Sequence, residues 1–244
     1  MTIRVPEPAS FEPFSVEHLV TLGIIVGLCG LIAWSAKRFS PAQRDGLGRA
    51  LGVSLAAYVV TAYMQKGLAG ELSWENSLPL ELCHCVLLAC IIALFWPDRL
   101  AFEIAYFWGL GGTLHAVVTP DLGLGFPSWD FIQFFWAHGT ILLAIVYLIA
   151  VRKLRPRAAS VPRMLLAVNL YALAVGALDL AFGWNYGYLR HPPSQPSLID
   201  YLGPWPWYIL SLELIALLSF IVLELPWRLL AKRNDRVLAS SRSS

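Results

Sequence analysis

Two reactive side chains lie side by side at the start of one apolar run. The stretch LPLELCHC, residues 78–85, places Cys83 and His84 just before residues that stay apolar as far as Trp96. A cysteine is a nucleophile in its thiolate form, and a nearby imidazole can take up its proton. His138, in a later apolar run, is the candidate base, because its depth and that of Cys83 differ by only about 4 Å when each helix is counted from its outer end.

Cys83 and His138 together predict acyl transfer. Attack of the sulfur on an acyl ester would give a thioester, which an alcohol or water could then resolve. A structural interpretation fits the same residues, because buried cysteines are usually inert and histidines at helix ends often satisfy only local bonds. The residue types alone leave both interpretations open.

A metal site is a weaker alternative for these residues. Cys83, His84 and Cys85 are successive on a helix and point about 100° apart, so they cannot all bind one ion. A metal would need Cys83 or His84 together with His115 and His138. No two ligands lie at i and i+4 on one helix, so we expect no metal, and the acyl chemistry needs no cofactor.

Two carboxylates inside later apolar runs, Asp179 and Glu213, suggest a different class of function. Carboxylates within a membrane often belong to proton or ion pathways. The alternative function is therefore a non-enzymatic transporter or small-molecule-binding protein, with a polar cavity lined by histidines and by these two carboxylates. An inverted repeat of hydropathy, typical of many transporters, is not visible. Either carboxylate could instead orient a histidine or bond the region around Asn185 and Tyr186.

The composition places all these residues in a membrane protein. The chain of 244 residues is 57% hydrophobic and 14% charged, whereas about a quarter of a soluble domain is charged. A helix needs roughly 20 apolar residues to cross about 30 Å of hydrocarbon. We predict an all-α, polytopic protein with a bundle of seven transmembrane helices. The expected spans are residues 16–36, 47–65, 79–96, 101–118, 131–151, 162–184 and 205–226.

Two short motifs predict how neighbouring spans pack. Only PDRL separates the two shortest runs, 79–96 and 101–118, so these should form an antiparallel hairpin. GLGG, residues 109–112, has the small side chains that let helices approach closely in a membrane.

The distribution of positive charge predicts the orientation. Most of the 18 lysines and arginines follow the first, third, fifth and seventh runs, and only Arg4, Lys66 and Arg190 fall on the other side. The positive-inside rule then places the amino terminus outside and the carboxyl terminus in the cytosol. The expected parts are an outer tail (1–15), the transmembrane domain (16–227) and a basic cytosolic tail (228–244). The small net charge gives no indication of nucleic-acid binding.

The ionisable groups of the spans fall in one layer in the outer half of the membrane when residues are counted at 1.5 Å each. An ionised group facing lipid costs at least about 2.5–3.5 kcal/mol, so these groups should face a polar cavity among the last five spans. Besides Cys83 and His138, the expected cavity residues are Glu81, His84, His115, Asp179, Asn185 and Glu213.

Four stretches resemble the YwaF-like family of bacterial integral membrane proteins. They are LPLELC (78–83), GTLHAVVTPDL (112–122), FIQFFWAHG (131–139) and NYGYLRHPPSQPSLIDYLGPWPWYIL (185–210). The eukaryotic relatives of that family include a transmembrane phospholipid acyltransferase. The resemblance implies a seven-helix fold and acyl transfer through the cysteine of LPLELC and the histidine of FFWAH, which are Cys83 and His138 here.

Two positions depart from the family pattern: Glu81 stands where a histidine is expected, and His115 where glutamine is commoner. A carboxylate beside Cys83 would disfavour the thiolate. Residues two apart on a helix face different ways, however, so the change concerns tuning of the thiol. We expect a multi-pass protein of the bacterial inner membrane that acts on a phospholipid or other acyl lipid at the outer leaflet.

Overall fold

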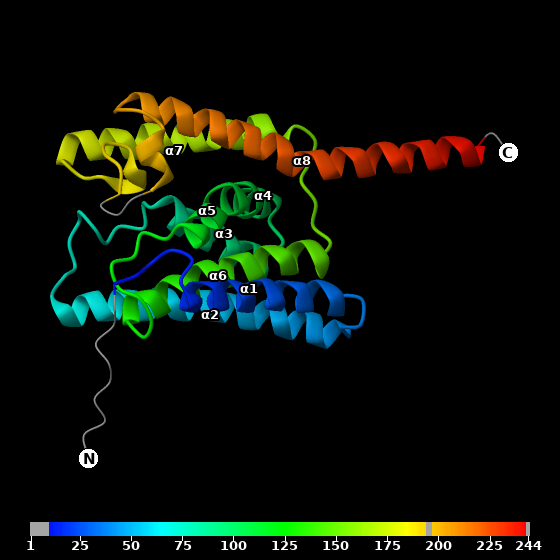
Figure 1. Cartoon of the computed structure of the whole chain (residues 1–244). Coiled ribbons are helices and arrows are strands. Elements are labelled where there is room, and N and C mark those ends of the chain that lie inside the picture. The colour runs from blue at the N-terminus through cyan, green and yellow to red at the C-terminus, as the bar shows by residue number, and fades with distance from the viewer. Residues whose placement is uncertain (1–9, 194–196, 243–244) are drawn as a thin grey trace, which may run out of the picture.

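The apolar runs of the sequence fold into helices, and the all-α prediction is confirmed for the residues that the computed structural model describes, 10–193 and 197–242 (Figure 1). Side chains are described only as far as residue 231. The helices are α1 (Val16–Ser35), α2 (Pro41–Ala69), α3 (Leu82–Phe95), α4 (Arg99–Trp108), α5 (Leu114–Val118), α6 (Trp129–Ala150), α7 (Ser160–Phe182) and α8 (Trp207–Arg242). A π-helical turn, Gly109–Thr113, joins α4 to α5, and short 3₁₀ turns occupy Tyr186–Tyr188 and Leu198–Tyr201.

Five helices of the described residues are long and apolar enough to cross a membrane. They are α1, α2, α6, α7 and the part of α8 from Trp207 to Ala231. The helix α3 is apolar but shorter, and the run predicted as the fourth span is divided among α4, the π-helical turn and α5. This finding does not test the count of seven spans or the orientation, and both stay predictions.

Local sequence signals explain where several helices begin. Ser40 caps α2, because its hydroxyl accepts from the Gln43 N–H at 3.3 Å while the Gln43 side chain accepts from the Ser40 N–H at 2.9 Å. Asp98 caps α4 through the Ala101 N–H at 2.7 Å. Ser128 caps α6 through the Phe131 N–H at 3.2 Å.

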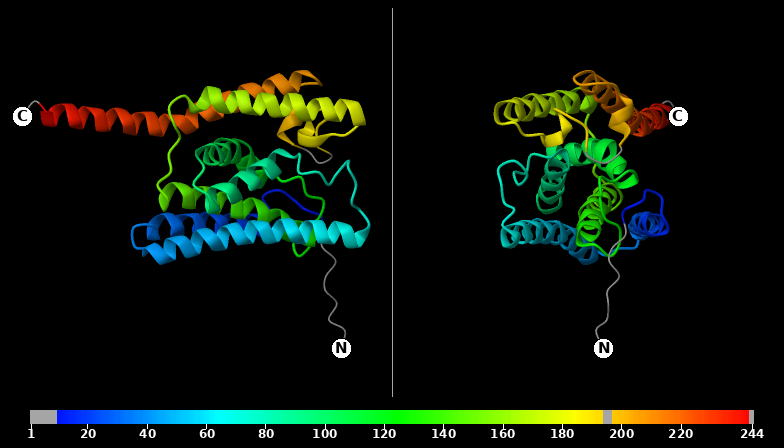
Figure 2. Two further views of the ribbon diagram at one scale, coloured as in Figure 1. Left: turned by 180° about the vertical axis from the view of Figure 1, so that it is seen from behind. Right: turned by 60° about the vertical axis from the view of Figure 1, so that its left-hand side comes forward.

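The helices form layers that are visible from two directions. The helices α1, α2 and α6 lie together on one side, and the antiparallel pair α7 and α8 lies on the other (Figures 1 and 2). The helices α3, α4 and α5 fill the space between them (Figure 1). The helix α6 packs against α1, α2, α3, α4 and α5, so it is the central helix of the bundle.

Small residues allow the close approaches that the core requires. An added Cβ at Gly52 of α2 would lie 2.6 Å from the ring of Phe95 on α3. The helices α3 and α4 pack against each other, which confirms the hairpin predicted from the short PDRL turn. Across that hairpin, an added Cβ at Gly109 would lie 3.2 Å from Val86, which confirms the close packing predicted from GLGG.

A fully buried carboxylate, Glu103 of α4, fastens the start of α7. It accepts bonds from the backbone N–H of Arg157 at 2.8 Å, from the Arg157 guanidinium at 2.7 and 3.1 Å, from the Ser160 hydroxyl at 2.7 Å and from the Arg163 guanidinium at 2.9 Å. Arg152, which follows the end of α6, pairs with Asp45 of α2 at 3.3 Å. We call this end of the molecule, defined by these six side chains, the basic end.

The structure describes only part of each predicted tail. Residues 1–9 of the predicted outer tail lie outside the described residues, but the Phe11 N–H donates to Gly123 at 3.1 Å. The predicted boundary at 227/228 lies inside α8, which continues as helix to Arg242. Arginine, leucine, alanine and lysine in that stretch are good helix formers, so the end of the apolar run does not end the helix.

Candidate functional site

Cys83 lies in the first turn of α3. Glu81 is the residue before the helix, and its carbonyl accepts from the N–H groups of His84 at 3.0 Å and Cys85 at 3.2 Å. Cys83 is therefore at the end where the helix dipole carries partial positive charge, which favours an anionic sulfur. Its thiol is half-buried and not in a disulfide.

His138 is buried on α6, with 8% of its surface exposed. Its Nδ1 lies 2.8 Å from the carbonyl oxygen of Phe134, one turn earlier. A carbonyl only accepts, so Nδ1 must carry the proton, and in the neutral imidazole Nε2 is left with a lone pair. The ring also stacks on Phe134 with 4.0 Å between centroids, which fixes its orientation.

The helices that carry Cys83 and His138 pack against each other. An added Cβ at Gly109, in the π-helical turn, would lie 2.5 Å from Ile145 and 3.2 Å from Val86, so α3, α6 and this turn meet there. Val86 is three residues after Cys83 and Ile145 is seven after His138, so each pair shares a helix face. Both candidate residues therefore lie on or beside the faces that form this junction.

His84 directly follows Cys83 in the first turn of α3. Its Nδ1 is buried and has no hydrogen-bond partner among the described residues.

A short segment after α7, residues 185–191, is bonded over the start of α3. The N–H of Gly187 donates to Glu81 Oε2 at 2.9 Å. The hydroxyl of Tyr188 donates to Asp121 Oδ2 at 3.1 Å, which connects the same segment to the loop before α6. We call residues 185–191 the clamp segment, because they join three parts of the chain that are far apart in sequence.

Tyr186 joins the clamp segment to the loop before α3. Its hydroxyl donates to the carbonyl of Trp74 and accepts from the N–H of Leu78, each at 2.9 Å. Its own backbone N–H donates to Asp179 Oδ1 at 3.0 Å. Asp179 is fully buried, and its second oxygen, Oδ2, has no partner among the described residues.

The sharp turn of the clamp segment requires glycine at position 187. Gly187 has φ +64°, in the left-handed region that favours glycine. An added Cβ would also lie 2.7 Å from the hydroxyl of Tyr171, which itself donates to the Leu80 carbonyl at 2.7 Å. Any larger residue at this position would displace either the clamp segment or Tyr171.

The electrostatics of the clamp segment follow from burial. Burial raises the pKa of the Glu81 carboxyl, and the bond from the Gly187 N–H partly offsets this. Burial and the nearby carboxylate of Asp121 raise the pKa of Tyr188, so its phenol keeps the proton that it donates. Glu81 therefore supports the clamp segment by accepting this bond, although a negative charge on Glu81 is costly at this buried position.

The remaining predicted cavity residues have other surroundings. The side chain of Asn185 bonds within the clamp segment, to the N–H groups of Arg190 at 3.0 Å and His191 at 3.1 Å. His115 is exposed on α5. Glu213 of α8 accepts from Asn169 of α7 at 2.6 Å. Cys83 and His84 thus follow Glu81, which the clamp segment contacts, whereas His115 and Glu213 lie elsewhere, on α5 and α8.

No set of three or more histidine, cysteine, aspartate or glutamate side chains within the described residues is arranged to hold a metal ion. The four cysteines are free.

Sequence reasoning missed the tyrosines that build the clamp segment's contacts, Tyr171, Tyr186 and Tyr188. Their signal was present in NYGYL, where a glycine between two tyrosines is typical of a tight turn that presents both rings. It also missed Trp136, which lies two residues before His138 and donates to Ser54 of α2 at 2.9 Å.

The helices and the buried polar groups between them define a polytopic, all-helical membrane protein. A model of the TMEM164 family matches residues 13–224, which is most of the chain, so the chain belongs to this transmembrane family. No curated protein matches the chain, and no solved structure does. The narrower YwaF-like relationship stays a prediction.

Proposed function

We propose that this membrane protein transfers or hydrolyses the acyl group of a lipid, with Cys83 as nucleophile and His138 as base. The observation that carries the proposal is the bond from His138 Nδ1 to Phe134, because it leaves Nε2 unprotonated on a helix that packs against α3. The proposal requires Cys83 Sγ and His138 Nε2 to lie within about 4–6 Å or to share a water.

The proposed reaction needs only the acyl lipid and an acceptor hydroxyl, and no oxidant or reductant. Cys83 Sγ attacks the acyl carbonyl carbon, its proton passes to His138 Nε2, and a C–S bond forms as the ester C–O bond breaks. The leaving alcohol takes the proton back from His138. A second hydroxyl, from a lipid acceptor or water, then attacks the thioester, and the thiol is regenerated with a new ester or a free acid as product.

The surroundings of Cys83 suit this mechanism in two ways. The α3 helix end favours negative charge that develops on sulfur. The thiol is half-buried and free of any disulfide, so it is available for attack, and a neutral base can take its proton as the C–S bond forms. The oxyanion role considered for Asn185 and His115 has less support, because the Asn185 side chain is already bonded within the clamp segment and His115 is exposed.

The membrane setting fits an acyl lipid as substrate. A bilayer-embedded site lets the acyl chain stay in hydrocarbon while its ester reaches the thiol. The charge distribution supports a site at the outer leaflet of a bacterial inner membrane, with the basic end in the cytosol. The chemistry requires no cofactor.

The alternative function, transport or small-molecule binding through Asp179 and Glu213, has less support. Both carboxylates make local bonds, Asp179 to the Tyr186 N–H and Glu213 to Asn169. Proton- or ion-coupled uptake that is lost in Asp179→Asn or Glu213→Gln, with Cys83→Ser fully active, would replace the proposal with transport.

The test is turnover of a phospholipid with a labelled acyl chain by the purified protein in nanodiscs. We expect labelled ester or free acid to form, and Cys83→Ser to abolish it. Cys90→Ala is the matched control, because Cys90 is fully buried on the same helix two turns further on, and it should keep its activity. Equal turnover in Cys83→Ser and the unaltered protein would overturn the proposal.

A further inference from the structure

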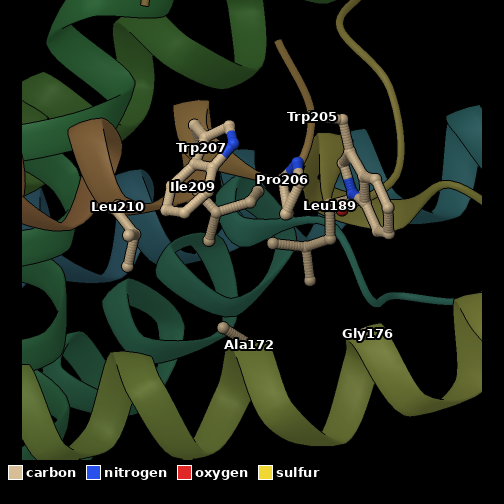
Figure 3. A pocket seen from close by; sticks show the side chains of 8 residues that line it. All are labelled: Ala172, Gly176, Leu189, Trp205, Pro206, Trp207, Ile209 and Leu210. Atoms are coloured by element: carbon tan, nitrogen blue, oxygen red, sulfur yellow. Dashed lines mark hydrogen bonds between the residues drawn. The ribbon is translucent and has the colours of Figure 1, made fainter. Parts of the chain in front are cut away.

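An apolar groove of about 350 Å³ lies between α7 and α8, where α7 approaches its end and α8 begins (Figure 3). Ala172 and Gly176 of α7 face the side chains contributed by α8 and by the segment before it (Figure 3). The lining residues are Ala172, Gly176, Leu189, Trp205, Pro206, Trp207, Ile209 and Leu210. No charged side chain lines the groove.

The groove exists because the α7 residues that line it are small. Ala172 and Gly176 are four residues apart and therefore share one face of the helix. An added Cβ at Gly176 would be 3.7 Å from Leu189, at ordinary contact distance, so anything longer would begin to fill the space.

A polar contact closes one end of the groove. Asn169 is three residues before Ala172 on α7, and Glu213 is three residues after Leu210 on α8. Because the two helices are antiparallel, both lie one turn beyond the lining, where Asn169 Nδ2 donates to Glu213 Oε1 at 2.6 Å. An apolar occupant of the groove would therefore end at this hydrogen bond.

The other end lies under aromatic residues, and one side is open to the surroundings. Trp205 donates from its indole N–H to the Leu189 carbonyl at 3.0 Å, which fixes it at the rim. Trp207 and Leu210 are 62% and 61% exposed. Exposed leucines continue around the groove, at Leu173 and Leu214. In a bilayer such a surface faces lipid tails, with tryptophans near the interface.

We propose that this groove binds one acyl chain of a membrane phospholipid. An uncharged lining excludes a headgroup, and a transmembrane helix about 10–12 Å wide is too thick for a space of this size. A single acyl chain is apolar and slender, and it is abundant at a surface that faces lipid. The Asn169–Glu213 contact would then limit how deeply the chain enters.

The groove is connected to the candidate site by the clamp segment. Leu189 lines the groove, and it directly follows Tyr188 and Gly187, which bond to Asp121 and Glu81. A chain that presses on Leu189 thus contacts the segment that lies over the start of α3. The claim that the bound lipid is also the substrate rests on the proposed function. Binding of an acyl chain in the groove does not itself require catalysis.

The test is photo-crosslinking in nanodiscs of phosphatidylethanolamine that carries a diazirine on one acyl chain. We use Cys83→Ser protein, so that no turnover consumes the probe. Crosslinks should concentrate on residues 172–176 and 206–210. Ala172→Leu should lower the crosslink yield there by at least about fivefold. The matched control is Ala174→Leu, the same change at an exposed position two residues away, and it should leave the yield unchanged.

The crosslink map of protein with an unaltered groove tests the inference even if Ala172→Leu fails to fold, because that map needs no substitution in the groove. Crosslinks spread evenly over the exposed leucines of α7 and α8 would overturn the inference, as would crosslinks to a second protein chain. Groove labelling without turnover in the native protein would refute the proposed function and keep the inference. Normal turnover with an even crosslink map would refute the inference and keep the proposed function.

Discussion

The basic end and the end that carries Cys83 are held together by different kinds of bond. At the basic end, charged side chains bond mostly to other side chains, as Glu103 does to Arg157 and Arg163. Around Cys83, tyrosines and carboxylates bond to backbone groups, as Glu81 does to Gly187. Bonds between side chains fix helices against one another, whereas bonds to backbone fix the course of loops.

This difference suggests a division of labour. Glu103 fastens two helices through five bonds, so the basic end should behave as a rigid scaffold. The clamp segment is held instead by hydrogen bonds that involve no ion pair, including three to residues 74–81 and one to Asp121, each worth about 1 kcal/mol. Local opening is therefore easier near Cys83, where a lipid substrate would have to enter.

Glu103→Gln should give the largest loss of stability. It removes the charge that pairs with Arg157 and Arg163, and bonds to charged groups contribute about 1.5–3 kcal/mol each before solvent screening of the two half-exposed arginines. We expect about 2 kcal/mol of destabilisation in thermal unfolding, with turnover per folded molecule unchanged.

Asp45→Asn is the control for that prediction. It breaks the more exposed pair with Arg152, which should contribute less than about 1 kcal/mol. If both variants unfold at the same temperature as the native protein, the basic end is not the scaffold described here.

Gly187→Ala should have a smaller effect on stability and a specific effect near Cys83. The left-handed backbone costs an alanine about 1–2 kcal/mol, and its Cβ would press on the Tyr171 hydroxyl. Hydrogen exchange should increase in residues 74–81 and in the clamp segment. Gly23→Ala, where an added Cβ meets nothing within 4 Å, should leave exchange there unaltered. Unchanged exchange in Gly187→Ala would show that the clamp segment does not depend on this turn.

Glu81→Gln should have the smallest effect, and that effect should depend on pH. Burial raises the pKa of Glu81 above its ordinary value of 4.5, so its contribution to stability is fully present below that value and is lost as pH rises through the folded pKa. Glutamine keeps an acceptor for the Gly187 N–H and stays neutral. Thermal unfolding should therefore match the native protein near pH 4 and exceed it by less than about 1 kcal/mol near pH 8. A variant that is less stable at pH 8 would mean that the charge itself holds the clamp segment.

Much of the fold could be predicted from the sequence because hydropathy reports which residues leave water. The apolar runs became helices, and PDRL and GLGG gave the correct local packing. The π-helical turn at Gly109–Thr113 could not be predicted, because α and π turns bury the same residues and differ only in backbone bonding. The continuation of α8 past Trp227 was missed because a boundary drawn from hydropathy ignores helix propensity.

The candidate site was only partly predictable. Counting residues along helices predicts similar depths for Cys83 and His138, and their helices do pack together. Depth says nothing of direction around the bundle, so counting alone could not predict that Glu213 bonds to Asn169. The clamp segment depends on bonds between residues about 70 to 110 positions apart, and only the tertiary structure brings those together.

The most direct test of the account is a search for an acyl group bound to Cys83. Purified protein is mixed with phospholipid, quenched within one turnover, and its intact mass and peptides are measured. We predict one acyl adduct on Cys83 that hydroxylamine removes, and formation about 100-fold slower in His138→Gln. An adduct that forms equally fast in His138→Gln, or one that maps to Cys29, Cys85 or Cys90 instead, would contradict the account.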